Sequence, residues 1–342
     1  MKKYDKYDAV DLALEDNQAV LDINEDELFV PVTLDEKESE HISKESYSYW
    51  KSVLRVFIRK PSAIIAITSL FLIIALSLIV PILTPAEYLR ADGTFATNIS
   101  IRDLAPGEEG VDGVSHFWGT DSIGRDLFYI TWTGARKSLV LAMISTTIIV
   151  IVGTLFGLIW GFFRKLDPFF VELYNLISNI PALLVYMLLA TIFMQRFPTM
   201  PAEIRLIIAL TMTSWIGLAR FLRNQIIIIN NREYNIASRA LGTPGFRIMF
   251  KNLLPYILAV IITNATLTIP GMISSEVTMS FFGVGLDSAT ASIGALLELG
   301  RTNFMLRPWQ LLAPAGVLAF IIFAFFLLGT SLSDALDPKK HR

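Results

Sequence analysis

The stretch EYNIASRALGTPGFRIMFKNLLP, residues 233–255, is a polar segment between two long apolar runs. Ala237 and its neighbours are small or favour helix, and the GTPG sequence that begins at Gly242 ends a helix and turns the chain. A second short helical segment then leads to Pro255, which suits the first turn of a following helix. A helix–turn–helix with small residues on one side and exposed cations on the other suits docking of a partner protein. A plain basic loop is the alternative.

The composition indicates an integral membrane protein. Of the 342 residues, 53% are hydrophobic and 18% are charged, and the mean hydropathy is +0.54, more apolar than a soluble domain. Cysteine is absent, which excludes disulfides and thiol chemistry. Residues 1–50 carry fourteen Asp and Glu against five Lys and Arg. We expect this tail to be a disordered cytoplasmic extension, with a regulatory role as the alternative, and residues 51–62 to form a basic amphipathic lead-in at the membrane.

Apolar runs long enough to cross a bilayer recur six times along the chain. Polar backbone groups cannot face lipid, so each run is expected to be a helix. The predicted fold class is therefore an all-α integral membrane protein with six transmembrane helices. The spans are expected near Ala63–Leu83, Ser138–Phe163, Phe169–Met194, Ile204–Ile229, Tyr256–Phe282 and Leu311–Leu332. The expected divisions are the first span at 63–83, an intervening segment at 84–137, a core at 138–332 that includes the loop 230–255, and a tail at 333–342.

Basic residues that flank the spans predict the orientation. Lys51, Arg55 and Lys60 precede the first span, so the N-terminus is expected in the cytoplasm. Six crossings return the C-terminus to the same side. The segment 84–137 then falls outside the cell, and the loop 230–255 falls inside it.

The sequence HFWGTDSIGRDLFYITWTGARKSL, residues 116–139, begins with a segment too polar for lipid. Its glycines permit turns, and its Asp and Arg side chains can pair with one another or cap helix starts. We expect a satisfied charge cluster that packs this segment against the second span, with direct substrate contact as the alternative. The residues concerned are Gly119, Asp121, Gly124, Arg125, Asp126 and Arg136.

Few polar side chains interrupt the apolar spans. Glu276 is a carboxylate in an apolar helix, which is costly unless the group is paired, hydrated or protonated. It either lines or gates a translocation path or lies at the outer interface, hydrogen-bonded to a neighbouring loop. Asn264 and Asn179 are further candidates for a water-filled path, and helix–helix hydrogen bonding is the alternative. Arg220 and Arg223 are expected to line a cavity or to extend to the interface.

The sequence contains no catalytic constellation. The phosphate-binding pattern GxxxxGK[ST] and the metalloprotease pattern HExxH are both absent, and none of the three His lies in a predicted span. We therefore expect a chain that is not itself an enzyme, with no metal site and no cofactor of its own.

Four segments carry a family resemblance. Residues 233–255 resemble the loop that permease subunits of bacterial ABC importers insert into their ATPase subunits. That loop's pattern is matched at Ala237, Gly242, Leu254 and Pro255, and Ile236, Ser238 and Asn252 depart from it. Residues 116–139 are similar to the GTDxxGRDxxxxxxxGARxSL signature of the dipeptide and oligopeptide permease branch. EVTMSFFGVGL at 276–286 and GTSLSDALDP at 329–338 resemble two further motifs of that branch.

The resemblance implies a type I ABC importer permease in the bacterial cell membrane, with both termini cytoplasmic, that forms part of an oligopeptide importer. The implied partners are a homologous permease, two cytoplasmic ATPases that bind ATP and Mg, an extracellular peptide-binding protein, an oligopeptide substrate and membrane lipid, without nucleic acid. The implied ATPase-docking residues are Glu233, Ala237, Ser238, Arg239, Gly242, Leu254 and Pro255. Import of nickel or another small solute is the alternative within the branch. A secondary transporter or channel is the alternative of another class.

Overall fold

The computed structural model of the protein describes residues 49–286 and 291–336. The chain divides into two units, residues 1–49 and 50–342, and the helices described here belong to the second unit apart from Tyr49, the first residue of α3. The tail predicted at 1–50 therefore lies almost entirely outside the described residues. Throughout the described ranges the regular structure is helical, and the only β-pairing consists of isolated bridges. The prediction of an all-α fold is confirmed.

The first membrane helix packs against the last one. α3 (Tyr49–Arg59) ends just before α4 (Pro61–Ile82), whose first residue is a proline with no N–H to leave unpaired. The hydroxyl of Ser331, on α13 (Trp309–Leu336), donates to the hydroxyl of Ser62 over 2.8 Å. Lys60 forms a 3.2 Å ion pair with Asp334 beside it. These contacts fix the start of α4 against the end of α13.

The longest helix, α5 (Leu127–Phe162), begins well before the span expected from Ser138. The reason is local: the carboxylate of Asp126 accepts hydrogen bonds from the backbone N–H groups of Phe128 and Tyr129 and so caps the helix. Residues 127–137, expected to belong to the intervening segment, are therefore helical.

A stripe of glycines brings α5 close to α8 (Ala202–Asn230). A Cβ on Gly153, Gly157 or Gly161 would come within about 3 Å of side-chain atoms of α8, so only glycine permits this separation. The stripe is therefore a surface for close helix packing.

The third predicted span is not a single helix. α6 (Asp167–Ser178) and α7 (Ala182–Arg196) replace the expected helix at Phe169–Met194. The bend between Arg164–Ser178 and Ala182–Arg196 is 83°. Pro181 lies at the break, where it has no N–H to donate and where its ring disfavours helical geometry for the residue before it. By length and composition, five individual helices of the described part suffice to cross a membrane, and the count is six if this bent pair is one span.

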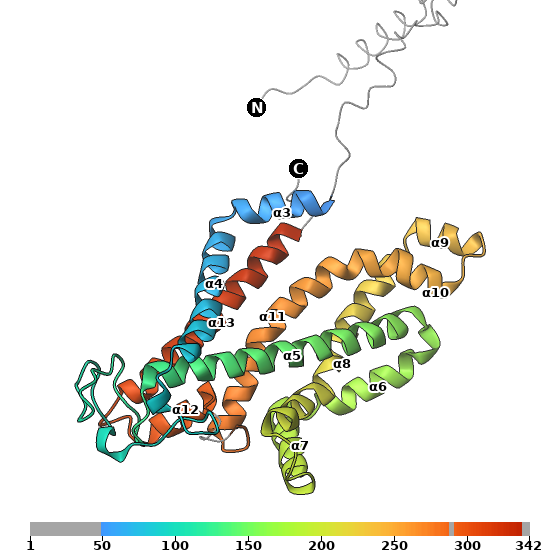
Figure 1. Ribbon diagram of the computed structural model, residues 1–342. Coiled ribbons are helices and arrows are strands. Elements are labelled where there is room, and N and C mark those ends of the chain that lie inside the picture. Colours follow the sequence, from blue (N-terminus) through green and yellow to red (C-terminus); the bar gives the residue numbers. More distant parts are fainter. Residues whose placement is uncertain (1–48, 287–290, 337–342) are drawn as a thin grey trace, which may run out of the picture. The chain divides into compact units, whose positions relative to one another are not determined.

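The remaining helices form a hairpin after α8, the long helix that follows it, and a short helix before α13. After α8 come α9 (Glu233–Ala240), α10 (Gly245–Arg247), the π-helical turn η4 (Ile248–Leu253), α11 (Leu254–Phe281) and α12 (Ile293–Thr302). Figure 1 shows α9 and α10 at one end of α11 and α12 near its other end. One continuous core of buried apolar side chains joins α4, α5, α8, α11 and α13. The hairpin at 233–253 and the polar segment at 84–126 therefore lie at opposite ends of helices that share one core.

Candidate functional site

Residues 233–253 form a hairpin, called here the coupling hairpin after the role that the sequence predicts for it. Its turn has the geometry of a glycine C-cap. Gly242 has φ +79°, in the left-handed region that glycine adopts without strain. Its N–H donates to the carbonyl of Arg239, and the N–H of Thr243 donates to the carbonyl of Ser238. These two bonds are the Schellman pattern, which satisfies the last carbonyls of a helix. The predicted helix stop at Gly242 is confirmed.

Buried amide groups hold the base of the coupling hairpin. Asn235 is fully buried, and its Nδ2 donates to the carbonyl of Ile229 at the end of α8 over 2.9 Å. Its Oδ1 accepts from Nδ2 of Asn252, on η4, over 3.0 Å. The guanidinium of Arg239 donates to the carbonyl of Asn230 over 2.6 Å. Because a buried polar group is costly without a partner, these bonds tie α9 to α8 and η4.

The tip of the coupling hairpin is exposed and partly apolar. Leu241, Phe246 and Ile236 are 86%, 72% and 52% exposed. Of the predicted docking residues, Ser238 and Leu254 are partly buried and the others are exposed: Glu233, Ala237, Arg239, Gly242 and Pro255. Exposed apolar side chains on a fixed support suit a contact with another protein. Their docking role stays a prediction.

Arg220 and Arg223, on α8, contact aromatic rings, and Arg223 forms an ion pair that the sequence did not predict. Arg223 forms a bidentate ion pair with Asp167: Nε and Nη2 lie 2.9 and 2.7 Å from the two carboxylate oxygens. The indole N–H of Trp160 donates to the same carboxylate over 2.7 Å. Arg220 lies 4.0 Å above the ring of Tyr174. The arginines therefore join α6 to α8, and Asp167 is the residue that sequence reasoning missed.

Glu276 is fully buried where three helices meet. Its carboxylate accepts from the hydroxyl of Ser138 on α5 over 2.8 Å and from that of Ser280 over 3.0 Å. The hydroxyl of Ser292, the residue that caps α12, is a third partner. A Cβ on Gly294 would lie 2.7 Å from Cβ of Ser280, so α12 packs closely here. This arrangement supports a structural joint between α5, α11 and α12, and the proposed gating role remains untested.

Asn264 and Asn179 lie in different places. Asn264 lines an open pocket of about 280 Å³ between α8, α11 and α13, together with Gln225, Thr263 and Ser333. Asn179 is exposed at the break between α6 and α7. The lining of the pocket also includes the apolar Phe221, Ala259, Val260 and Leu336. The polar side chains come from three membrane helices, which suits a hydrated path. The structure does not bring Asn179 to this pocket.

The polar segment at 84–126 is called here the outer segment, after the side of the membrane that the sequence predicts for it. It is organised by an Asp–Arg turn. Asp121 accepts from the backbone N–H of Arg125 over 2.8 Å and from its Nε over 2.6 Å. A Cβ on Gly124 would overlap the carbonyl of Asn98, and one on Gly119 would overlap that of Leu104. The predicted charge cluster at Asp121, Arg125 and Asp126 is thus observed, with glycine required at both turns.

The outer segment is also fixed to α13, through residues that the sequence did not single out. Nε2 of Gln310 donates to Oδ1 of Asp103 over 2.8 Å, and Arg307 lies 3.2 Å from the other oxygen of the same carboxylate. Arg136, by contrast, is exposed on α5 and lines a pocket that also includes Thr84 and Lys137. Arg136 therefore does not join the Asp121–Arg125 turn.

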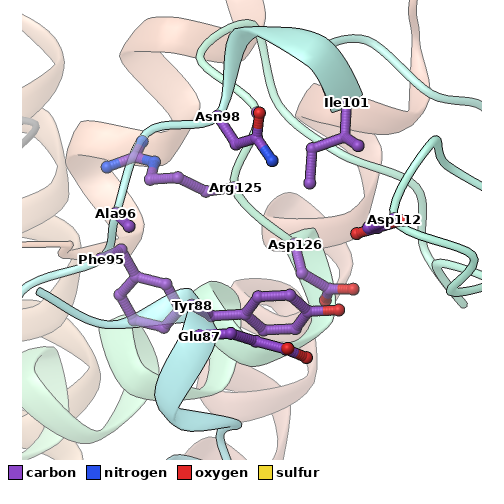
Figure 2. A pocket seen from close by; sticks show the side chains of 10 residues that line it. Glu87, Tyr88, Phe95, Ala96, Asn98, Ile101, Asp112, Arg125 and Asp126 are labelled. Atoms are coloured by element: carbon purple, nitrogen blue, oxygen red, sulfur yellow. The ribbon is translucent and has the colours of Figure 1, made fainter.

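A cavity of about 240 Å³ opens within the outer segment. Figure 2 shows the side chains that line it. The carboxylates of Asp126 and Asp112 and the phenol of Tyr88 lie on one side of it, and the side chain of Arg125 lies on the other. His116 Nδ1 is 2.8 Å from Oδ2 of Asp126. Burial, and then the negative charge of Asp126, raises the pKa of Tyr88 to about 12.

Together, the helices and the coupling hairpin define a multi-pass helical membrane protein with a polar segment at one end and a protruding, braced hairpin at the other. Comparison with known proteins narrows this class. Residues 153–342 match the family described as binding-protein-dependent transport system inner membrane component. Residues 48–106 match the N-terminal TM domain of oligopeptide transport permease C.

Full-length relatives agree with this match. The chain is 37% identical over 316 residues to the oligopeptide transport system permease protein AmiD of Streptococcus pneumoniae, covering 92% of this chain and 98% of the relative. It is 32% identical over 316 residues to the oligopeptide transport system permease protein OppC of Bacillus subtilis, with the same coverage. It is 32% identical over 319 residues to the dipeptide transport system permease protein DppC of the same organism, covering 93% of this chain and 94% of the relative.

The chain belongs to the family of binding-protein-dependent transport system inner membrane components. The predicted type I importer permease fold and the location as a multi-pass protein of the cytoplasmic membrane are confirmed. Membership implies a transporter complex with other subunits. The orientation of the termini stays a prediction.

Proposed function

We propose that this chain is the permease subunit of an ATP-driven oligopeptide importer and is coupled to ATPase subunits through the coupling hairpin. The names of the relatives, which are oligopeptide and dipeptide transport permeases, support the substrate class. The observation that carries the coupling role is the contrast between the exposed apolar tip at Leu241 and Phe246 and the buried base at Asn235.

A hairpin built in this way transmits force from its tip to the membrane helices. Displacement of the tip moves α9, and the amide bonds of Asn235 pass that displacement to the end of α8 and to η4. η4 continues directly into α11. α8 and α11 both line the pocket that contains Gln225 and Asn264. Closure of two ATPases on the hairpin would therefore alter the hydrated pocket and switch the path between its two sides.

The remaining subunits follow from this assignment. A homologous permease supplies the other wall of the path, and an extracellular peptide-binding protein delivers the oligopeptide at the end formed by the outer segment and α12. ATP and Mg are bound by the ATPases, and this chain holds no cofactor and catalyses no reaction. The N-terminus, the C-terminus and the coupling hairpin lie in the cytoplasm in this arrangement.

Substitution of Gly242 tests the coupling role. Among the described residues, sequence neighbours aside, no heavy atom lies within 4 Å of a Cβ at this position. Gly242→Asp therefore acts on the fold through its backbone preference and adds a charge at the exposed turn. Gly113→Asp is the matched control, because Gly113 also has positive φ and open surroundings but lies in the outer segment. We expect loss of ATPase co-purification and of peptide uptake for Gly242→Asp alone, with normal membrane insertion of both variants. Normal co-purification of the ATPases with Gly242→Asp would refute the coupling role.

A further inference from the structure

A basic pocket lies beside the coupling hairpin, where α5 and α8 end. It has a volume of about 500 Å³ and is lined by Phe162 and Phe163, by the cations Arg164, Lys165 and Arg239, and by Asn230 and Asn231. Its walls thus come from the end of α5, from η3 (Arg164–Leu166), from the end of α8 and from α9. The pocket is distinct from the exposed hairpin tip at Leu241 and Phe246 and from the membrane pocket at Asn264.

The charge of this basic pocket is uncompensated within the part of the chain that the structure describes. None of the residues that line the pocket is an Asp or a Glu. Among the described residues, no acidic side chain forms an ion pair with Arg164, Lys165 or Arg239. The acidic residue nearest in sequence, Asp167, is already engaged by Arg223 and Trp160. Three cations that share one concave surface without an anion make a favourable place for a negatively charged group.

The surroundings of the pocket indicate a lipid rather than a soluble anion or an acidic protein. The pocket lies where two apolar membrane helices end. Exposed apolar side chains flank it, with Phe163, Leu166 and Phe169 48%, 39% and 64% exposed. Cations beside exposed apolar side chains at a helix end suit a headgroup phosphate together with the acyl chains below it.

We propose that this pocket binds the headgroup phosphate of an anionic phospholipid. Arg164 and Lys165 contact the phosphate from the end of α5, and Arg239 contacts it from the base of the coupling hairpin. Hydrogen bonds to the carbonyls of Asn230 and Asn235 hold the guanidinium of Arg239 at the pocket wall. A bound lipid would therefore bridge η3 and α9. The binding does not depend on the function proposed for the hairpin.

The test uses the full-length chain, purified in neutral detergent with any subunits that accompany it. Native mass spectrometry measures retention of added phosphatidylglycerol, with phosphatidylcholine as the zwitterionic comparison. The pocket variant is Arg164→Gln/Lys165→Gln. The matched control is Arg247→Gln/Lys251→Gln, which removes two exposed cations of the coupling hairpin that do not line the pocket. Each basic side chain near an anionic surface contributes about fivefold, so we expect about thirtyfold weaker phosphatidylglycerol retention when the pocket variant loses two of them. In the control we expect retention within about twofold of the wild type.

Several results would overturn the proposal. Equal retention of phosphatidylcholine, unchanged retention in the pocket variant, or an equal loss in the control would each exclude a specific anionic lipid site. Displacement of the lipid by inorganic phosphate at equal concentration would identify a site for free phosphate. Loss of a co-purifying subunit with retention of the lipid would identify a protein contact. If the pocket variant misfolds, Arg164→Lys/Lys165→Arg keeps both charges and should retain phosphatidylglycerol, and its failure to do so while folded would contradict the proposal.

Discussion

The side-chain nitrogen of Asn252 donates to the side-chain oxygen of Asn235 over 3.0 Å, joining the two limbs of the coupling hairpin across its base. The nitrogen of Asn235 in turn donates to the carbonyl of Ile229 on α8. One buried amide therefore contacts both the helix that enters the hairpin and the turn that leaves it. This relationship makes the hairpin a rigid extension of α8 and α11.

Asn235→Ala is expected to loosen the hairpin without unfolding the membrane helices. It leaves the amide of Asn252 and the carbonyl of Ile229 without the side chain of Asn235 as their hydrogen-bond partner. Each group that stays buried without a partner lowers the stability of the hairpin by about 1–3 kcal/mol. Amide hydrogen exchange across residues 233–253 should accelerate, while exchange in α5 stays unchanged. Asn231→Ala, at an exposed position at the end of α8, is the control. Wild-type exchange rates in the Asn235 variant would show that these amides do not brace the hairpin.

Replacement of Glu276 separates a structural joint from a gate. Glu276→Ala removes the acceptor of the buried Ser138 and Ser280 hydroxyls. We expect the free energy of unfolding to fall by about 3 kcal/mol. We expect folded yield and peptide uptake to fall together. Glu276→Gln keeps the shape and can still bond both hydroxyls, so it should retain most of both. Normal folded yield with abolished uptake in Glu276→Ala would contradict the structural role and identify a gate.

The contact between Asp167 and Arg223 should contribute modestly to stability. The two side chains are 34% and 25% exposed, so solvent screens the pair and Asp167→Asn should cost only about 1 kcal/mol. For a chain of this size the expected fall in Tm is about 2 °C in detergent. Glu172→Gln, an exposed acid on the same helix, should leave Tm unchanged. A fall as large in Glu172→Gln as in Asp167→Asn would mean that general charge on α6, rather than this pair, sets the stability.

The local features of the fold could be predicted from sequence, whereas its long-range polar contacts could not. The stop at Gly242 and the glycine stripe at Gly153, Gly157 and Gly161 follow from residue types whose preferences act within a few residues or along one helix face. The break at Pro181 had a signal too, since proline disfavours helix at the residue before it. Its consequence, two helices bent by 83°, depends on packing that no local preference encodes.

The contacts that were missed join residues distant in the chain. Asp167 and Arg223, and likewise Asp103 and Gln310, come together only after the helices have packed. A single sequence contains each side chain but nothing that specifies its partner. The same limit applies to Glu276: its position in an apolar helix predicts that it needs a partner, but the identity of Ser138 as that partner follows only from the fold.

Tyr88 gives a pH-dependent prediction for the outer segment. Its ordinary pKa is 10.0, and burial together with the negative charge of Asp126 raises the pKa to about 12 in the folded protein. The neutral phenol is therefore favoured by folding, so the stability that it contributes is present below pH 10 and is lost as the pH rises toward 12. A spectroscopic titration of the tyrosines should contain a late component that Tyr88→Phe reduces. The part that remains belongs to Tyr234, whose pKa is also raised, by burial and by the neighbouring Tyr256. A late component of unchanged size in Tyr88→Phe would refute this assignment.

The central claim is that this chain works as one subunit of an ATP-driven importer, and purification of the tagged chain from native membranes in a mild detergent tests it most directly. Identification of the co-purifying proteins should show a homologous permease and two ATPase subunits. Recovery of the chain alone or only with copies of itself, under conditions that keep other membrane complexes intact, would contradict the account.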